Sequence, residues 1–285
     1  MRSMTSSTSI KGIAAIVGVG PKLGRSIARK FAHEGYTVAI LARDLGSLSC
    51  SLSFTYMGFV GRLSIFADEI AREEKAQVFA IRIDCSDSRS VREAFEGVLS
   101  LGFVEVLVYN AYQPAVSRQP TNFTDICIDS FVKSLAISSA GAFLCAQQVL
   151  PGMVERGRGT ILFTGCSSSL NGIACLSELC CGKFALRALS QCLSREFQSQ
   201  GVHVAHVIID GVIGPPIARA PPSSQRTSSA GEQQQQQQGV AGGEMVMDPD
   251  WLAQTYWHLH VQGRTAWTQE IDLRPSNSTN PTRFT

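Results

Sequence analysis

Three glycines, Gly18, Gly20 and Gly24, lie close together between an apolar run at residues 13–17 and an amphipathic stretch at residues 25–34. Glycine lets the backbone bend sharply and lets a ligand's phosphate groups approach the bare amides. The start of a helix adds partial positive charge at the same place. Glycines spaced in this way are therefore typical of a turn that holds the phosphates of a dinucleotide.

The residues around this turn must supply a strand before it and a helix after it. The β-branched run 13–17 predicts the strand, and the stretch 25–34 has the period of an amphipathic helix. A second apolar run, 36–41, follows Gly35 and predicts another strand. Glycines can also merely close a turn between strand and helix, but the complete strand, helix and strand pattern favours nucleotide binding. We count Lys22 and Leu23, within the turn, among the candidate cofactor-binding residues.

The end of the second predicted strand reads Ala42-Arg43-Asp44. An acidic residue here would bind the ribose hydroxyls of NAD, whereas a basic residue would pair with the additional phosphate of NADP. Arg43 and Lys22 could converge on that phosphate, while Asp44 argues for NAD. We therefore expect NADP(H) to be preferred, with NAD possible.

A third candidate group, Asp84-Cys85, follows the predicted strand 77–83. Asp84 would end that strand at the cofactor edge, where its carboxylate can accept a hydrogen bond from an adenine amino group. The alternative role for Asp84 is to cap the next helix, for which Ser86 or Asp87 is better placed. We therefore expect Asp84 and Cys85 to lie beside the cofactor.

Strand and helix patterns alternate along most of the chain, which predicts a Rossmann-type, doubly wound parallel sheet of about seven strands in three α/β/α layers. We expect residues 1–285 to form a single NAD(P)-binding domain. The further strands are expected at 104–108, 160–164, 202–209 and 270–273, and the further helices at 65–74, 88–101, 125–153, 178–198 and 251–259.

Two segments do not fit this alternation. Residues 47–61 carry no charge and separate two parts of an otherwise ordinary connection, so we interpret them as an insertion. Residues 215–247 are rich in Pro, Ser, Gln and Gly, and we expect them to form a low-complexity, mobile loop over the substrate.

Composition excludes several classes of function. The 285 residues are 44% hydrophobic, enough for a core, and the net charge of +2 offers no basic field for nucleic acid. We found no apolar run suited to a membrane span, and the nine cysteines have no paired spacing that predicts a metal site. We expect a cytoplasmic protein, although the acid-free, Ser/Thr-rich residues 1–11 leave import into an organelle open.

The glycine turn, Asp84, the pair Asn110-Ala111, Lys183 and the strand alternation together resemble the short-chain dehydrogenase/reductase family. The resemblance covers about residues 12–214 and 248–273. It implies a Rossmann-type domain that binds NAD(P), with Asn110 and Ala111 beside the cofactor, and a hydride transfer to or from a small carbonyl or alcohol substrate. It also implies that Val212 and Ile213, after the sixth strand, hold the nicotinamide carboxamide.

The family's catalytic residues match this chain only in part. The resemblance puts Lys183 at the position of the family's lysine, but Leu179 occupies the position of its tyrosine. Cys166 stands where the family has a serine, and Ser138 where it has an asparagine. Leucine cannot transfer a proton, so the family's ordinary mechanism is not available to this arrangement.

Two functions remain open at this point. In the first, an NAD(P)(H)-dependent oxidoreductase uses another proton donor, which could be Tyr112, Ser167 or Cys166, with Lys183 ordering a water. In the second, the chain binds NADP(H) without catalysis and acts as a sensor or partner subunit. The resemblance also implies a homodimer or homotetramer formed through helices 125–153 and 178–198.

Overall fold

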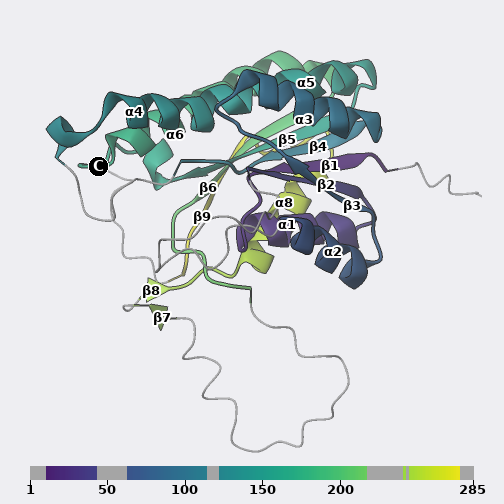
Figure 1. Ribbon diagram of the computed structural model, residues 1–285. Coiled ribbons are helices and arrows are strands. Elements are labelled where there is room, and N and C mark those ends of the chain that lie inside the picture. Colours follow the sequence, from purple (N-terminus) through teal and green to yellow (C-terminus); the bar gives the residue numbers. More distant parts are fainter. Residues whose placement is uncertain (1–10, 44–62, 114–121, 217–239, 242–243, 277–285) are drawn as a thin grey trace, which may run out of the picture.

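The computed structural model describes residues 11–43, 63–113, 122–216, 240–241 and 244–276 (Figure 1). The expected insertion at 47–61, residues 1–10 and most of the low-complexity segment 215–247 lie outside the described residues.

Seven parallel strands form one sheet, as predicted, in the order β3-β2-β1-β4-β5-β6-β9. A sheet with helices on both faces buries its strands on both sides, so its strands are apolar throughout rather than alternating. All five residues of β1 and all eight of β6 are buried accordingly. The strands are β1 Ile13–Val17, β2 Thr37–Ala42, β3 Val78–Arg82, β4 Val104–Tyr109, β5 Gly159–Cys166, β6 Val202–Ile209 and β9 Glu270–Leu273.

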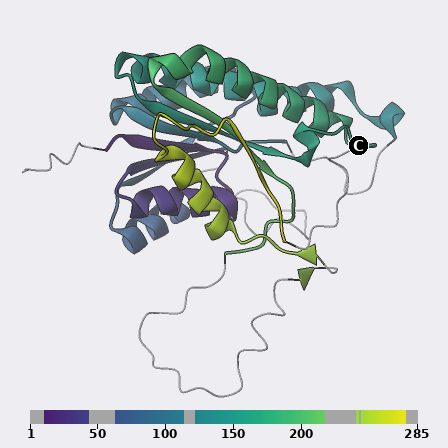
Figure 2. The same cartoon turned by 180° about the vertical axis from the view of Figure 1, so that it is seen from behind.

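Helices cover both faces of the sheet and complete the three layers (Figures 1 and 2). One core lies between the sheet and α1 (Leu23–His33), α2 (Leu63–Glu74) and α8 (Pro249–His260). A second core lies on the other face, under α3 (Ser88–Ser100), α5 (Gly141–Glu155) and α6 (Ser177–Phe197). The doubly wound α/β fold that the sequence predicts is confirmed.

The predicted helix 125–153 is not one continuous α-helix. A 3-10 turn, η1 (Phe123–Asp125), precedes α4 (Ile128–Leu135), and a five-residue π-helical segment, η2 (Ala136–Ala140), joins α4 to α5. A π-helical turn adds a residue and changes the direction of the side chains that follow, and such turns are frequent at functional sites. Hydrophobic periodicity does not reveal this change.

The same helical run corrects one expectation about composition. By length and composition, Ile128–Glu155 is apolar enough to cross a membrane. The Ser, Gln and Gly residues within this run keep it from standing out as a continuous apolar segment in the sequence. In the fold, α5 packs on the sheet through Cys145, Val149 and Met153, and the core helix of a globular domain passes the same test of composition.

The chain after β6 is ordered near the sheet. Ile213 forms a parallel bridge with Met247. Two short strands, β7 (Val240–Ala241) and β8 (Glu244–Met245), pair in an antiparallel arrangement inside the region that the sequence predicts to be a loop. Helix α8 then begins as predicted, because the side chain of Asp248 accepts a hydrogen bond from the Asp250 amide.

Candidate functional site

The candidate site lies at the carboxyl ends of the parallel strands. Helix α1 crosses one face of the sheet after β1, whereas α5 follows β4 on the other face. The strand order therefore reverses between β1 and β4, which are neighbours in the sheet. In open α/β sheets, ligands bind in the crevice outside such a reversal.

The turn after β1 fits tightly against the end of β4. Gly18 has a φ of +84°, and a Cβ atom there would lie 2.4 Å from the Ala111 nitrogen. The Asn110 side chain donates a hydrogen bond from Nδ2 to the Gly18 oxygen at 3.0 Å. Asn110 and Ala111 therefore lie against the glycine turn, and their contact with a cofactor stays a prediction.

The other two glycines have different surroundings. A Cβ atom at Gly24 would lie 2.8 Å from the Val19 Cα, so this glycine lets α1 pack closely on the turn. A Cβ atom at Gly20 would meet nothing within 4 Å. The open side of Gly20 adjoins the beginning of α1, where the first amides of a helix lack partners within the helix. The turn therefore fits a phosphate-bearing cofactor.

A pair of substitutions tests the different surroundings of Gly18 and Gly20. Gly18→Ala should lower the free energy of unfolding by about 2 kcal/mol or more, because it combines a left-handed backbone with a steric clash. Gly20→Ala should change it by less than about 0.5 kcal/mol, as expected at an open position. Urea unfolding measures both. Equal losses for the two variants would contradict the geometry described above.

Lys22 has a different partner from the one that the sequence suggested. Its Nζ donates to the Ile213 oxygen at 2.5 Å, which joins the glycine turn to the segment after β6. The convergence of Lys22 and Arg43 on one phosphate stays a prediction, whereas this bond of Lys22 to a carbonyl was not expected. Sequence spacing could not show it, because the two partners are 191 residues apart.

Arg43, Asp84 and Cys85 gather at the ends of β2 and β3. Arg43 is exposed, and its charge acts on both Asp84 and Cys85. Ser86 hydrogen-bonds one oxygen of Asp84 through its Oγ at 2.6 Å, and this bond is the main cause that lowers the pKa of Asp84. Asp87 caps α3, and it is one of the two residues, with Ser86, that the sequence offers for this role. A contact between Asp84 and adenine stays a prediction.

Lys183 lies deep beside the end of β5. Its side chain is 4% exposed, and its Nζ donates to the Thr164 oxygen at 2.9 Å. Burial lowers the pKa of Lys183, and the adjacent Cys166 opposes that shift. A buried lysine held in this way can place a proton or a positive charge beside reacting groups.

Tyr112 and Cys166 both adjoin Lys183. The Nζ of Lys183 lies 5.4 Å from the centroid of the Tyr112 ring, and Tyr112 is 50% exposed. Cys166 ends β5, and its side chain accepts from the Ser169 amide while the Ser169 hydroxyl accepts from the Cys166 amide. The fold therefore brings three of the proposed catalytic residues together.

Ser138 and Leu179 lie on neighbouring helices. Ser138 is in the π-helical segment, fully buried, and its hydroxyl has no hydrogen-bond partner among the described residues. Gly182 of α6 packs against it, since a Cβ atom there would lie 2.8 Å from the Ser138 Cβ. Leu179 lies one helical turn before Lys183 on α6 and is half-buried.

Sequence reasoning missed Thr164 and Tyr256. The Thr164 carbonyl holds Lys183, and its hydroxyl hydrogen-bonds the Tyr256 hydroxyl of α8 at 2.7 Å. Burial raises the pKa of Tyr256. The only signal in the sequence is a polar residue within the apolar run of β5. No group of His, Cys, Asp and Glu suited to a metal ion occurs within the described ranges.

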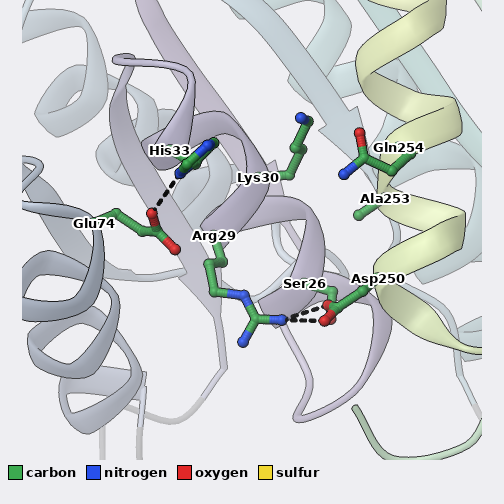
Figure 3. Close-up of a pocket in the computed structure, with 8 residues that line it drawn as sticks. All are labelled: Ser26, Arg29, Lys30, His33, Glu74, Asp250, Ala253 and Gln254. Carbon is green, nitrogen blue, oxygen red and sulfur yellow. Dashed lines mark hydrogen bonds and ion pairs between the residues drawn. The ribbon is translucent and has the colours of Figure 1, made fainter. Parts of the chain in front are cut away.

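A separate pocket of about 80 Å³ lies between α1, α2 and α8 (Figure 3). Two pairs of its lining residues interact: Arg29 binds Asp250, and His33 hydrogen-bonds Glu74 at 2.8 Å. None of the candidate site residues lines it. These pairs connect α1 with α8 and α2.

The glycine turn at the sheet reversal, with a buried lysine beyond it, defines a Rossmann-type protein whose site suits a dinucleotide. The profile described as "short chain dehydrogenase" matches residues 60–222. The chain therefore belongs to the short-chain dehydrogenase family, whose members are oxidoreductases.

Three relatives illustrate the similarity. A short-chain dehydrogenase/reductase of Armillaria gallica is 28% identical, over 70% of each chain. The inactive 2-(S)-hydroxypropyl-CoM dehydrogenase 2 of Xanthobacter autotrophicus is 27% identical, over 55% of this chain and 66% of its own. The alcohol dehydrogenase of Thermococcus sibiricus, solved with 5-hydroxy-NADP, superimposes with a TM-score of 0.72 at 21% identity, over 95% and 99% of the two chains.

Proposed function

We propose that this chain is an NADP(H)-dependent oxidoreductase of small carbonyl or alcohol substrates, in which Tyr112 exchanges the proton with the substrate oxygen. The observation that carries the proposal is the position of the Lys183 ammonium beside the Tyr112 ring, 5.4 Å from its centroid. A cation near a phenol favours the anion that remains after proton transfer. The exposure of Tyr112 leaves its ring accessible to a substrate.

The residues of this chain have separate roles in the proposed reaction. The glycine turn and Asn110 would hold the phosphate end of the cofactor, and Arg43 and Asp84 would hold the adenosine end. Val212 and Ile213 would hold the nicotinamide carboxamide through their backbones. When bound, the cofactor would supply or accept the hydride. Tyr112 gives its proton to the carbonyl oxygen, and Lys183 stabilises the resulting phenolate.

Tyr112 is favoured over the two other candidates by their local bonding. Cys166 and Ser169 cap each other at the end of β5, so the Cys166 sulfur has a structural role there. Ser167 begins the 3-10 turn η3 (Ser167–Ser169), and no contact with Lys183 like that of Tyr112 is described for it. Ser138 is buried behind Gly182, and its hydroxyl has no hydrogen-bond partner among the described residues. This hydroxyl could therefore bind a water between Lys183 and solvent.

The alternative is an NADP(H)-binding protein without catalysis. Two observations support it: leucine at position 179, and a relative that is itself named as inactive. A titration with NADPH, followed by a panel of ketones, aldehydes and sugars, tests the proposal. Substrate-dependent loss of the NADPH absorbance supports the oxidoreductase. Tight binding without turnover on the whole panel supports the alternative.

Cofactor choice gives a separate prediction. Arg43→Ala should weaken NADPH binding by about 1.5 to 3 kcal/mol, the contribution of a charge-assisted hydrogen bond, and should leave NADH binding nearly unchanged. Calorimetric titration with both cofactors measures the ratio. Lys75→Ala, another exposed cation beyond α2, serves as the control and should leave both affinities unchanged. Equal affinity of the parent protein for NADH and NADPH would contradict the assignment of Arg43 to the additional phosphate of NADPH.

The expected oligomeric state gives another prediction. Leu186 and Leu193, two of the apolar residues on helix α6, are buried against the sheet, but Phe184 and Phe143 are 41% and 46% exposed on α6 and α5. We propose a homodimer through these two helices, which would cover both rings. Light scattering at micromolar concentration should show a dimer that Phe184→Glu converts to a monomer. Trp251→Glu, on α8, is the control and should remain dimeric. A monomeric parent protein would refute the interface.

A further inference from the structure

A pair of buried thiols lies under the loop that follows β3. Cys85 comes directly after Asp84 and is 5% exposed, and Cys145 of α5 is fully buried. Both side chains belong to the same hydrophobic core, between the sheet and α5. The proposed reaction uses neither sulfur.

Close packing at Gly141 brings the two cysteines together. A Cβ atom at Gly141 would lie 2.8 Å from the Cys85 Cβ and 2.6 Å from the Cys85 oxygen. Cys145 follows Gly141 by four residues, so it lies on the same face of α5, one turn along. The backbone of α5 therefore runs against Cys85 and presents the Cys145 thiol beside it.

The two thiols differ in exposure. Cys85 is 5% exposed in the loop after β3, whereas Cys145 is fully buried. The neighbouring Cys145 side chain is the main cause that lowers the pKa of Cys85, and burial raises the pKa of Cys145. Because the thiolate is the reactive form and Cys85 is the more accessible of the two thiols, Cys85 is the nucleophile and Cys145 the resolving thiol.

We propose that Cys85 and Cys145 are a modification site that a peroxide oxidises to a reversible disulfide. The Cys85 thiolate attacks one oxygen of hydrogen peroxide, the O–O bond breaks, and the departing hydroxide takes a proton to become water. The Cys145 sulfur then attacks the sulfur of the resulting sulfenic acid. The S–O bond breaks, and the hydroxyl leaves as water with the Cys145 proton. One peroxide and two thiols give one disulfide and two waters.

The disulfide would change the adenosine end of the site. A disulfide draws its two Cβ atoms to within about 4.5 Å, which ties the Asp84-Cys85 loop to α5. Arg43 acts on the same loop, since its charge reaches both Asp84 and Cys85. Oxidation should therefore weaken NADPH binding, and bound NADPH should slow oxidation. These two effects rest on the proposed function, whereas the disulfide itself does not.

Peptide mapping tests the disulfide directly. Trypsin releases Cys85 in residues 83–89 and Cys145 in residues 134–156, each with one cysteine. After treatment with hydrogen peroxide and alkylation, we expect a linked peptide lighter by two hydrogens than the sum of the two, and dithiothreitol should remove it. Cys85→Ser and Cys145→Ser should each abolish it, whereas Cys192→Ser, on the exposed face of α6, should retain it.

The contrary results are equally clear. The proposal is overturned if the oxidised parent protein yields residues 83–89 and 134–156 only as separate peptides, alkylated or oxidised to the sulfinic acid. This result does not depend on whether any variant folds. Repeating the oxidation with NADPH separates the two proposals. A linked peptide that forms equally fast with NADPH present, in a protein that shows no NADPH binding, would support the disulfide and count against the proposed cofactor.

Discussion

Tyr112→Phe is expected to lower kcat for carbonyl reduction by about 100- to 10,000-fold, the usual contribution of general acid–base catalysis. The substitution removes the hydroxyl but keeps the aromatic ring that lies beside Lys183. The cofactor contacts are on other residues, so the affinity for NADPH should stay the same. Steady-state kinetics with the best substrate of the panel, together with an NADPH titration, measures both quantities.

A matched control separates the lost proton donor from a lost hydrogen bond. Tyr36 directly precedes β2, at the amino ends of the strands and away from the candidate site, and its hydroxyl hydrogen-bonds the His260 Nε2 at 2.6 Å. Tyr36→Phe should lower the free energy of unfolding and leave kcat unchanged. If Tyr112→Phe retains kcat within about twofold, Tyr112 is not the donor, since the expected loss is at least about 100-fold. Cys166→Ala and Ser167→Ala would then identify the group.

The combined variant Leu179→Tyr, Cys166→Ser is expected to raise kcat by up to about 100-fold, because it places a phenol one helical turn before Lys183 and a hydroxyl at the end of β5. The gain rests on the family resemblance. Ser138 limits it, since the asparagine that the resemblance implies at that position is absent. The same panel of substrates measures the change, and Leu179→Phe, Cys166→Ser is the control without the phenol.

Failure of the combined variant would also be informative. If it folds, binds NADPH and shows no gain on any carbonyl, the pocket differs from the family's arrangement in more than these two positions. The transfer of the family's mechanism to this chain would then be withdrawn. The role proposed for Tyr112 would be unaffected, because it depends on its own contact with Lys183.

Much of the fold follows from local patterns. Strands β1, β6 and β9 have their predicted bounds. Largely apolar runs with clear limits define β1 and β6, whereas β9 alternates polar and apolar residues. Gly18 behaves as predicted, since the tight turn requires a positive φ that only glycine adopts easily. Burial on both faces of the sheet makes such strands conspicuous in sequence.

Other features depend on contacts between distant residues. The bond from Lys22 to the Ile213 carbonyl arises only when the segments after β1 and β6 come together. The contact of Lys183 with Tyr112 likewise arises only when α6 meets the segment after β4. The π-helical segment that holds Ser138 has no periodic signal, since one added residue hardly changes the apolar pattern. The sequence thus predicted which residues belong to the candidate site, but it could not predict which atoms they contact.

Transfer of labelled hydride tests the central claim most directly. The protein is incubated with the carbonyl panel and with NADPH deuterated at the transferable positions of the nicotinamide, and the products are examined by mass spectrometry. We predict an alcohol that carries one deuterium on its former carbonyl carbon, in a yield that falls with Tyr112→Phe. If the protein binds NADPH and no product carries deuterium, the chain is not an oxidoreductase of carbonyl compounds.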